Sequence, residues 1–286
     1  MFSKIMKRCL IVLVIAIPIV CIGSVYANDY STKIVEIETR ANIKQKFLLI
    51  TAPNPAGTIV LFEGGVNPLK LKEKFGKPKI DSIMENGFLM RTRYEYVKQG
   101  FNVAAIDAPS DQKKLDLKFR MSNNHAADIE SLAVYLKKEF KLPVWLVGMS
   151  AGTISSISCA IQLQENIDGV VTFSAVTRSR KKWDIYESHP NCILDLQLDK
   201  IKVPVLIVYH KKDKCDATPP ADAEKFKTAI FNSTNVKVNM FEGGKTYYGE
   251  YKEMARSCGP YSSHGYYGIE VEVVKFVSDY IKSIYQ

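Results

Sequence analysis

Short, almost continuous apolar runs alternate with helical patterns along most of this 286-residue chain. Apolar runs without polar alternation are typical of strands that are covered on both faces. Because strands that alternate with helices form βαβ crossovers, the order favours an α/β fold: a three-layer α/β/α sandwich with a mainly parallel sheet of about eight strands. The strands are predicted at residues 34–37, 47–51, 58–62, 102–107, 144–147, 169–174, 203–209 and 236–241, the first two as a hairpin.

Two helices are predicted from apolar residues at helical spacing. Residues 124–140 follow Asn123, which is the expected N-cap, and residues 268–285 repeat the pattern near the end of the chain. In a sheet built from βαβ units, the functional loops lie at the carboxyl ends of the strands. Residues that carry chemistry are therefore expected directly after each strand.

The first 27 residues have the pattern of an export signal. Three basic residues precede a short apolar stretch at residues 9–22, and Val-Tyr-Ala at residues 25–27 is a small-residue cleavage site. We therefore predict a signal peptide at residues 1–27 and a periplasmic or secreted protein whose contact with a membrane is limited to export. An uncleaved membrane anchor is the alternative, although the stretch is short for a span of about 20 residues.

The remaining residues, 28–286, contain no repeat, low-complexity segment or flexible linker and are expected to form one domain. Hydrophobic residues make up 47% of the chain and charged residues 24%, proportions that exclude a disordered or coiled-coil protein. The formal net charge is +9, but the basic residues are scattered among acids and no recognised module accompanies them, so no nucleic-acid partner is expected. The oligomeric state is left open.

No cofactor or metal is predicted. The chain has no H-E-x-x-H motif and no paired C-x-x-C motif, the spacings that commonly hold zinc. Residues 243–246 read Gly-Gly-Lys-Thr and imitate the end of a phosphate-binding loop, but Asn239 stands where that loop needs its first glycine. The backbone amides that would bind a phosphate are therefore not encoded.

A G-x-S-x-G pattern at residues 148–152 carries the strongest chemical signal. It follows the predicted strand at residues 144–147 and opens an apolar helical segment, which is the strand, turn and helix context that this motif needs. The two glycines permit a sharp turn, and the turn raises the hydroxyl of Ser150 above the edge of the sheet. The alternative is a buried serine in a tight turn with no role in catalysis.

A serine hydroxyl becomes a good nucleophile only when a base removes its proton and an acid orients that base. Asp213 follows the predicted strand at residues 203–209, and His264 precedes the last predicted helix. The order serine, aspartate, histidine is that of the α/β-hydrolases.

Other side chains compete for the roles of acid and base. Asp216 lies on the same loop as Asp213, and Asp107 ends an earlier strand, so both remain alternatives for the acid. His125 opens a predicted helix and is expected to make a structural hydrogen bond. The competing histidines, none of which follows the last predicted strand, are His125, His189 and His210.

With these residues in place, the chain from residue 28 onward resembles the α/β-hydrolase superfamily. The segments at residues 61–65, 148–152, 210–219 and 264–270 resemble a subgroup of exported bacterial serine hydrolases of uncertain substrate. The resemblance implies a catalytic triad and an oxyanion hole built from two backbone amides. The residues it assigns are Ser150 as nucleophile, Asp213 as orienting acid, His264 as base, and Ala151 and Gly65 as oxyanion donors.

Glu63 marks a departure from that resemblance, because many relatives carry histidine at the corresponding position of an H-G-x turn. Residues 175–202 correspond to the place where relatives insert a small lid, and the basic residues at 178–182 lie within it. They are expected to form an exposed basic loop, with an anion-attracting rim as the alternative.

The resemblance also implies a disulfide between Cys215 and Cys258. The first lies two residues after the proposed acid and the second six residues before the proposed base, on loops that must meet over the nucleophile in this fold. An exported protein is in a compartment where such a bond persists. Cys159 and Cys192 form a less supported second pair.

The implied activity is hydrolysis of a small-molecule or acyl substrate, with a carboxylic ester as the first expectation (EC 3.1.1). A peptidase or a thioesterase with the same triad is an alternative. A binding protein that keeps the fold without turnover is an alternative from another class.

Overall fold

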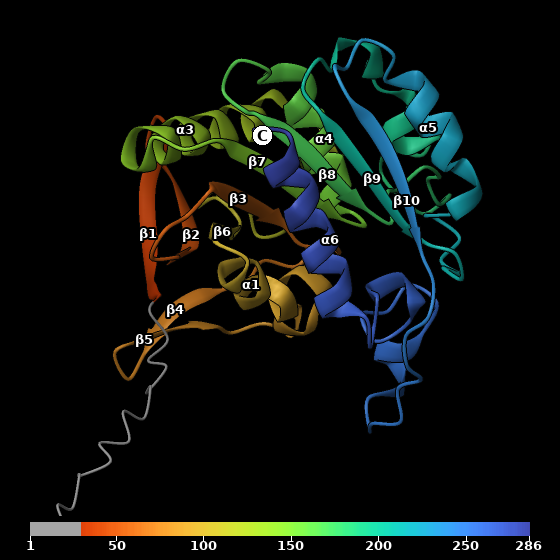
Figure 1. Cartoon of the computed structure of the whole chain (residues 1–286), viewed down its shortest axis with the longest axis horizontal. Coiled ribbons are helices and arrows are strands. Elements are labelled where there is room, and N and C mark those ends of the chain that lie inside the picture. Colours follow the sequence, from red (N-terminus) through yellow and green to blue (C-terminus); the bar gives the residue numbers. More distant parts are fainter. Residues whose placement is uncertain (1–29) are drawn as a thin grey trace, which may run out of the picture.

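Eight strands lie side by side in one sheet across the middle of the protein (Figure 1). The computed structural model describes residues 30–286, so the predicted signal peptide lies outside the described residues. From one edge to the other, the strands are β1 (Ser31–Arg40), β2 (Ile43–Thr51), β6 (Phe101–Ile106), β3 (Gly57–Phe62), β7 (Val144–Met149), β8 (Gly169–Phe173), β9 (Val205–His210) and β10 (Val236–Phe241).

The pairing of the strands agrees with the predicted, mainly parallel sheet. β1 and β2 form the expected antiparallel hairpin, β2 is antiparallel to β6, and each further neighbouring pair is parallel. Every residue of β3, β6, β7, β8 and β9 is buried, which explains why these strands lack polar alternation. The loops that follow the parallel strands meet at one edge of the sheet.

Helices cover both faces of the sheet (Figure 1). The five longer ones are α1 (Phe88–Lys98), α3 (Asn123–Phe140), α4 (Gly152–Gln162), α5 (Ala223–Ala229) and α6 (Glu270–Ser283). α3, α4 and α5 share one core with Phe62 and Leu146, whereas α1 and α6 share the other with Leu61 and Val147. Because successive strand residues point to opposite faces, these two cores are the two sides of the predicted sandwich.

α3 begins one residue earlier than predicted, and its N-cap is Ser122 rather than Asn123. The Oγ of Ser122 accepts a 3.2 Å hydrogen bond from the amide of His125, while Asn123 is already helical. Serine and asparagine cap helices about equally well, so the sequence alone could not discriminate between two adjacent candidates.

Several elements were not predicted, because they lack a long periodic pattern. The polar hairpin of β4 (Leu71–Lys74) and β5 (Lys77–Ile80) forms a separate two-stranded sheet. The other short elements are α2 (Leu117–Arg120), η1 (Ile83–Asn86), η2 (Cys192–Asp195), η3 (Leu198–Lys200), η4 (Pro220–Asp222), η5 (Lys252–Ala255) and η6 (Ser263–Gly265). Across residues 30–286, no helix has both the length and the apolar character needed to cross a membrane.

Candidate active site

Ser150 stands on a tight turn between β7 and α4. Its φ of 50° lies in the left-handed region, which residues with a β-carbon rarely adopt. A β-carbon at Gly152 would lie 1.9 Å from the carbonyl oxygen of Phe62, and one at Gly148 would lie 2.5 Å from the carbonyl oxygen of Gly152. The amide of Ser150 donates a 2.9 Å hydrogen bond to the carbonyl of Phe173, which ties the turn to β8. Both glycines of the motif are therefore sterically required.

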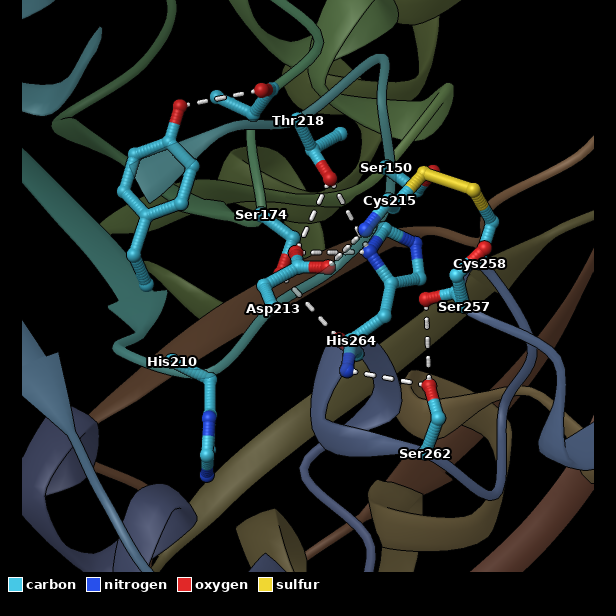
Figure 2. A network of polar contacts seen from close by, with 12 residues as sticks. Ser150, Ser174, His210, Asp213, Cys215, Thr218, Ser257, Cys258, Ser262 and His264 are labelled. Atoms are coloured by element: carbon cyan, nitrogen blue, oxygen red, sulfur yellow. Dashed lines mark hydrogen bonds and ion pairs between the residues drawn. A yellow bond between two sulfur atoms is a disulfide. The ribbon is translucent and has the colours of Figure 1, made fainter. Parts of the chain in front are cut away.

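Asp213 and His264 meet although 51 residues separate them along the chain. The Oδ2 atom of Asp213 lies 2.9 Å from Nδ1 of His264, and neither the carboxylate nor the ring is appreciably exposed (Figure 2). Oδ1 accepts a 2.8 Å hydrogen bond from the amide of Cys215, and Oδ2 accepts a 3.0 Å bond from the hydroxyl of Thr218. Because carboxylate oxygens accept hydrogen bonds, this contact favours the tautomer of His264 that carries the proton on Nδ1, and Nε2 has no hydrogen-bond partner within residues 30–286.

The backbone of His264 is held from two sides in the short helix η6. Its amide donates to Oγ of Ser262 at 3.2 Å, and its carbonyl accepts from Oγ of Ser174 at 3.2 Å (Figure 2). Ser174 directly follows β8, so this contact joins the histidine loop to the sheet edge that also carries the serine turn. Ser174 and Thr218 are polar neighbours of the site that no local sequence pattern distinguishes.

Ser150 lies where two cavities meet. One cavity of about 280 Å³ is lined by both Ser150 and His264, and its remaining walls are mainly apolar, from Ile83, Met84, Phe88, Met149, Met254 and Pro260. The second cavity, of about 480 Å³, carries charged side chains including Arg180 and Lys182. Gly65, Ser150 and Cys258 line both cavities, so a molecule that spans them passes over the serine.

The two amides expected to form the oxyanion hole both lie at these cavities. Gly65 lines both of them and has a φ of 69°, and Ala151 lines the larger one. Neither amide has a hydrogen-bond acceptor in the described part of the chain. The loop approaches the serine turn closely, since a β-carbon at Gly64 would lie 3.2 Å from Cβ of Ser150. The geometry therefore leaves two free donors beside the candidate nucleophile.

Glu63, the residue that departs from the family pattern, is a buried carboxylate beside this loop. Its Oε1 accepts a 2.8 Å hydrogen bond from the amide of Gly64, and its Oε2 accepts a 3.0 Å bond from the amide of Met90 in the first turn of α1. Burial raises the pKa of Glu63 above its ordinary value, against the lowering effect of these amides. Glu63 thereby links the loop after β3 to the start of α1.

A disulfide joins Cys215 to Cys258, the pair expected from the sequence (Figure 2). It connects the loop of Asp213 to the segment that leads into His264. Arg180 forms an ion pair with Asp216 and donates a 3.0 Å hydrogen bond to Sγ of Cys258, so it covers the bridge from outside.

The less supported second pair does not form. Cys159 and Cys192 are both buried and free. Cys159 lies in the interior of α4, whereas Cys192 begins η2. Burial raises the pKa of the Cys159 thiol well above its ordinary value and that of the Cys192 thiol to about 12. Neither thiol is therefore a thiolate at neutral pH.

The competing acids are engaged elsewhere. Asp216 is exposed and pairs with Arg180, and Asp107 accepts a 2.7 Å hydrogen bond from the amide of Leu71. Neither carboxylate hydrogen-bonds to His264, whose carboxylate partner is Asp213.

The competing histidines are also accounted for. His125 packs against the rings of Phe62 and Phe119, and neither of its ring nitrogens has a partner within residues 30–286. Burial lowers its pKa to about 3. The expectation of a structural hydrogen bond from His125 is thus wrong, because the ring sits in an apolar layer. Nδ1 of His210 accepts a local hydrogen bond of 3.0 Å from the amide of Lys212, and its Nε2 lies 3.1 Å from the carbonyl oxygen of Gly243. His189 contacts the preceding serine.

The basic segment at residues 178–182 is partly neutralised by neighbouring acids. Arg178 forms an ion pair with Asp222 at 3.1 Å, and Arg180 pairs with Asp216 while lying over the ring of Trp183. In the described chain, the one group of side chains close enough to share a metal ion is Cys215, Asp216 and Cys258, whose two sulfurs are joined in the disulfide.

Comparison with solved structures assigns the protein to the α/β-hydrolase fold, as the resemblance implied. It is similar to a cold-adapted esterase from an Arctic intertidal metagenomic library (11% identity, TM-score 0.57, 88% of this chain and 95% of that one). The esterase Pf2001 from Pyrococcus furiosus (17%, TM-score 0.57, 89% and 93%) and Est1E from Butyrivibrio proteoclasticus (15%, TM-score 0.57, 87% and 97%) are similar to the same extent. No protein-family model and no curated protein sequence matches the chain.

Proposed function

We propose that this protein is an exported serine hydrolase that transfers an acyl group to water. The observation that carries the proposal is the buried contact of 2.9 Å between Asp213 and His264, with the histidine lining the same cavity as Ser150. The fold by itself hosts many functions, so the proposal depends on this site rather than on the fold.

In the first half of the reaction, Ser150 Oγ attacks the carbonyl carbon of the substrate while Nε2 of His264 takes the hydroxyl proton. Asp213 stabilises the imidazolium that results. The negative charge that develops on the carbonyl oxygen is met by the free amides of Ala151 and Gly65. A donor of this kind typically contributes about 3 to 4 kcal/mol to the stability of the transition state.

The tetrahedral intermediate then collapses. The bond to the leaving group breaks, and the imidazolium of His264 returns its proton to that group, so that Ser150 is left acylated. In the second half, Nε2 takes a proton from water as the water attacks the acyl carbon. When the second intermediate collapses, the bond between the acyl carbon and Ser150 Oγ breaks, the imidazolium of His264 returns its proton to Oγ, and the carboxylic acid is released.

A small carboxylic ester is the substrate class that we favour. The similar structures include proteins named as esterases, and the cavity shared by Ser150 and His264, at about 280 Å³, is at the small end of ligand pockets. Its apolar walls suit a short hydrocarbon group. Amide, peptide and thioester bonds are cleaved by the same machinery and are therefore included in the test.

An exported location is part of the proposal. Its support is the N-terminal signal pattern together with the disulfide between Cys215 and Cys258, since such bonds persist in oxidising compartments.

The test uses a fluorophosphonate probe, which labels activated serines covalently. We expect the wild-type protein to be labelled and Ser150→Ala to be unlabelled, while the exposed Ser188→Ala serves as a control that labels normally. A panel of p-nitrophenyl esters, aminoacyl amides and thioesters then defines the bond that is cleaved. A folded wild-type protein without labelling or turnover would instead be a binding protein.

A further inference from the structure

Arg120, the last residue of the short helix α2, is buried with only 1% of its surface exposed. A buried charge is costly unless its hydrogen bonds are satisfied. The hydrogen bonds that Arg120 makes in the described chain go to carbonyl and hydroxyl oxygens rather than to a carboxylate. The hydrogen bonds of this arginine therefore brace the backbone and α4, although burial, which lowers its pKa, is opposed by the nearby charges of Glu63 and Asp116, which raise it.

The guanidinium contacts three separate segments. Nη2 donates to the carbonyl oxygens of Gly65 at 2.9 Å and of Glu63 at 3.2 Å. Nη1 donates to Oγ of Ser155 in α4 at 2.8 Å, and Nε donates to the carbonyl of Leu115 at 3.1 Å. Arg120 thus connects the loop after β3 to the helix that follows the candidate nucleophile.

We define the oxyanion loop as residues 63–66. The carbonyl of Glu63 belongs to the peptide before the Gly64 to Gly65 peptide, and the carbonyl of Gly65 belongs to the peptide after it. Nη2 of Arg120 therefore holds the peptides on both sides of the Gly64 to Gly65 peptide. The N–H of the middle peptide is the free amide of Gly65, and the amide of Gly64 is held by the Glu63 carboxylate at 2.8 Å. The neighbours of the donor peptide are therefore fastened while the donor itself is left free.

A loop with two consecutive glycines needs such fastening. Glycine populates both signs of φ readily, so the Gly64 to Gly65 peptide could rotate and turn its N–H away from the serine. An oxyanion donor stabilises the transition state most when it is already oriented before the reaction.

We propose that Arg120 is a positioning residue that holds the oxyanion loop in its donating conformation. This inference rests on the proposed function, because it concerns the same site. The side chain acts through the carbonyls of Glu63 and Gly65 and does not touch the substrate.

The charge of Arg120 supports the same role. Burial lowers its pKa to about 10, so the guanidinium remains protonated at neutral pH. Its positive charge beside the loop favours the negative charge that develops during the reaction. Lysine keeps the charge but offers a single nitrogen, which cannot reproduce a fork that reaches four oxygens.

The experiment compares Arg120→Lys with the wild-type protein and with Arg40→Lys as a matched control. Arg40 is also a forked arginine, but it binds Asp111 and Asp128 beside the edge strand β1 and lines neither cavity. The probe is the fluorophosphonate, because its phosphoryl oxygen enters the oxyanion hole. The maximal inactivation rate and the probe concentration at half-maximal rate are measured separately, and thermal melting checks folding.

Loss of one oriented donor costs roughly 100- to 1000-fold in rate. Because Arg120→Lys loosens the donor without removing it, we expect a smaller fall of the maximal inactivation rate, by about 10- to 100-fold, with less than about a threefold change in the half-maximal concentration. Hydrogen exchange at residues 63–66 should accelerate in Arg120→Lys and not in Arg40→Lys.

Three outcomes would overturn the inference. An unlabelled wild-type protein removes the proposed function and this role together. A labelled wild type with an unchanged maximal rate in a folded Arg120→Lys removes the positioning role alone. If Arg120→Lys does not fold, Ser155→Ala removes the hydroxyl that accepts from Nη1 and is a milder perturbation of the same brace, and unchanged exchange at residues 63–66 in that variant would also refute the inference.

Discussion

Loss of the disulfide between Cys215 and Cys258 should destabilise this protein by an amount that follows from the length of the loop that the bond closes. The bridge closes a loop of 43 residues. In the chain-entropy model, a loop of that length restricts the unfolded chain by about 4 kcal/mol at 25 °C. This is a large part of the roughly 5 to 15 kcal/mol by which domains are stable.

The assay is urea unfolding of Cys215→Ala, Cys258→Ala and the double variant. Each single variant already loses the whole bond. We therefore expect the free energy of unfolding to fall by about the same 4 kcal/mol in all three variants, so that the loss in the double variant is far smaller than the sum of the two single losses. Reductant should lower the stability of the wild type by a similar amount and leave the three variants unchanged. Cys159→Ala, which removes a free buried thiol, should keep its sensitivity to reductant.

The loops joined by the bridge carry Asp213 and lead into His264, so the labelling rate with fluorophosphonate should also fall when the bond is lost. The reasoning is refuted if the wild type and the double variant have equal free energies of unfolding with and without reductant. Additive effects of the two single variants would likewise show that each cysteine contributes by packing and not through a shared bond.

Three further predictions concern the glycine turn, the buried glutamate and the N-terminus. Gly152→Ala should cost at least about 3 kcal/mol in urea unfolding, because its β-carbon would lie 1.9 Å from the carbonyl oxygen of Phe62; a loss below about 1 kcal/mol would contradict this. Burial raises the pKa of Glu63, so its proton stabilises the folded state fully below the ordinary value of 4.5, and that stabilisation is lost as the pH rises through the raised pKa. The stability of Glu63→Gln relative to wild type should therefore rise over this interval, and parallel pH profiles of the two proteins would exclude it. N-terminal sequencing of exported protein should begin at Asn28, whereas an intact residue 1 would indicate an uncleaved anchor.

Local sequence patterns were sufficient for the sheet and the serine turn. The five fully buried strands carry their own signal, because a strand covered on both faces is mainly apolar along its whole length. The glycines at 148 and 152 are likewise dictated by sterics within a few residues of Ser150 and at the adjacent strand. The polar hairpin of β4 and β5, whose strands have four residues each, and the helix α1 were not predicted.

The candidates for acid and base could be ranked from the sequence, but the side chains that hold them in place could not be identified. Chain order favoured Asp213 and His264, and the resemblance joined Cys215 to Cys258. The structure adds Thr218 and Ser174, whose hydroxyls hold the carboxylate and the histidine backbone. Ordinary hydroxyl residues in loops have no distinguishing local pattern, so only their final neighbours reveal them.

Arg120 shows most clearly that a role which depends on distant neighbours cannot be read from local sequence. In the sequence, Arg120 is one of 39 basic residues and looks like part of a solvated surface. Its role depends on carbonyls 55 and 57 residues earlier in the chain, and on complete removal from water. The amino-acid order determines which side chains can form apolar strands and a glycine turn, because those preferences act within a few residues. Which polar groups lose their water and find partners depends on packing between distant segments, and that is set only when the sheet and its helices come together.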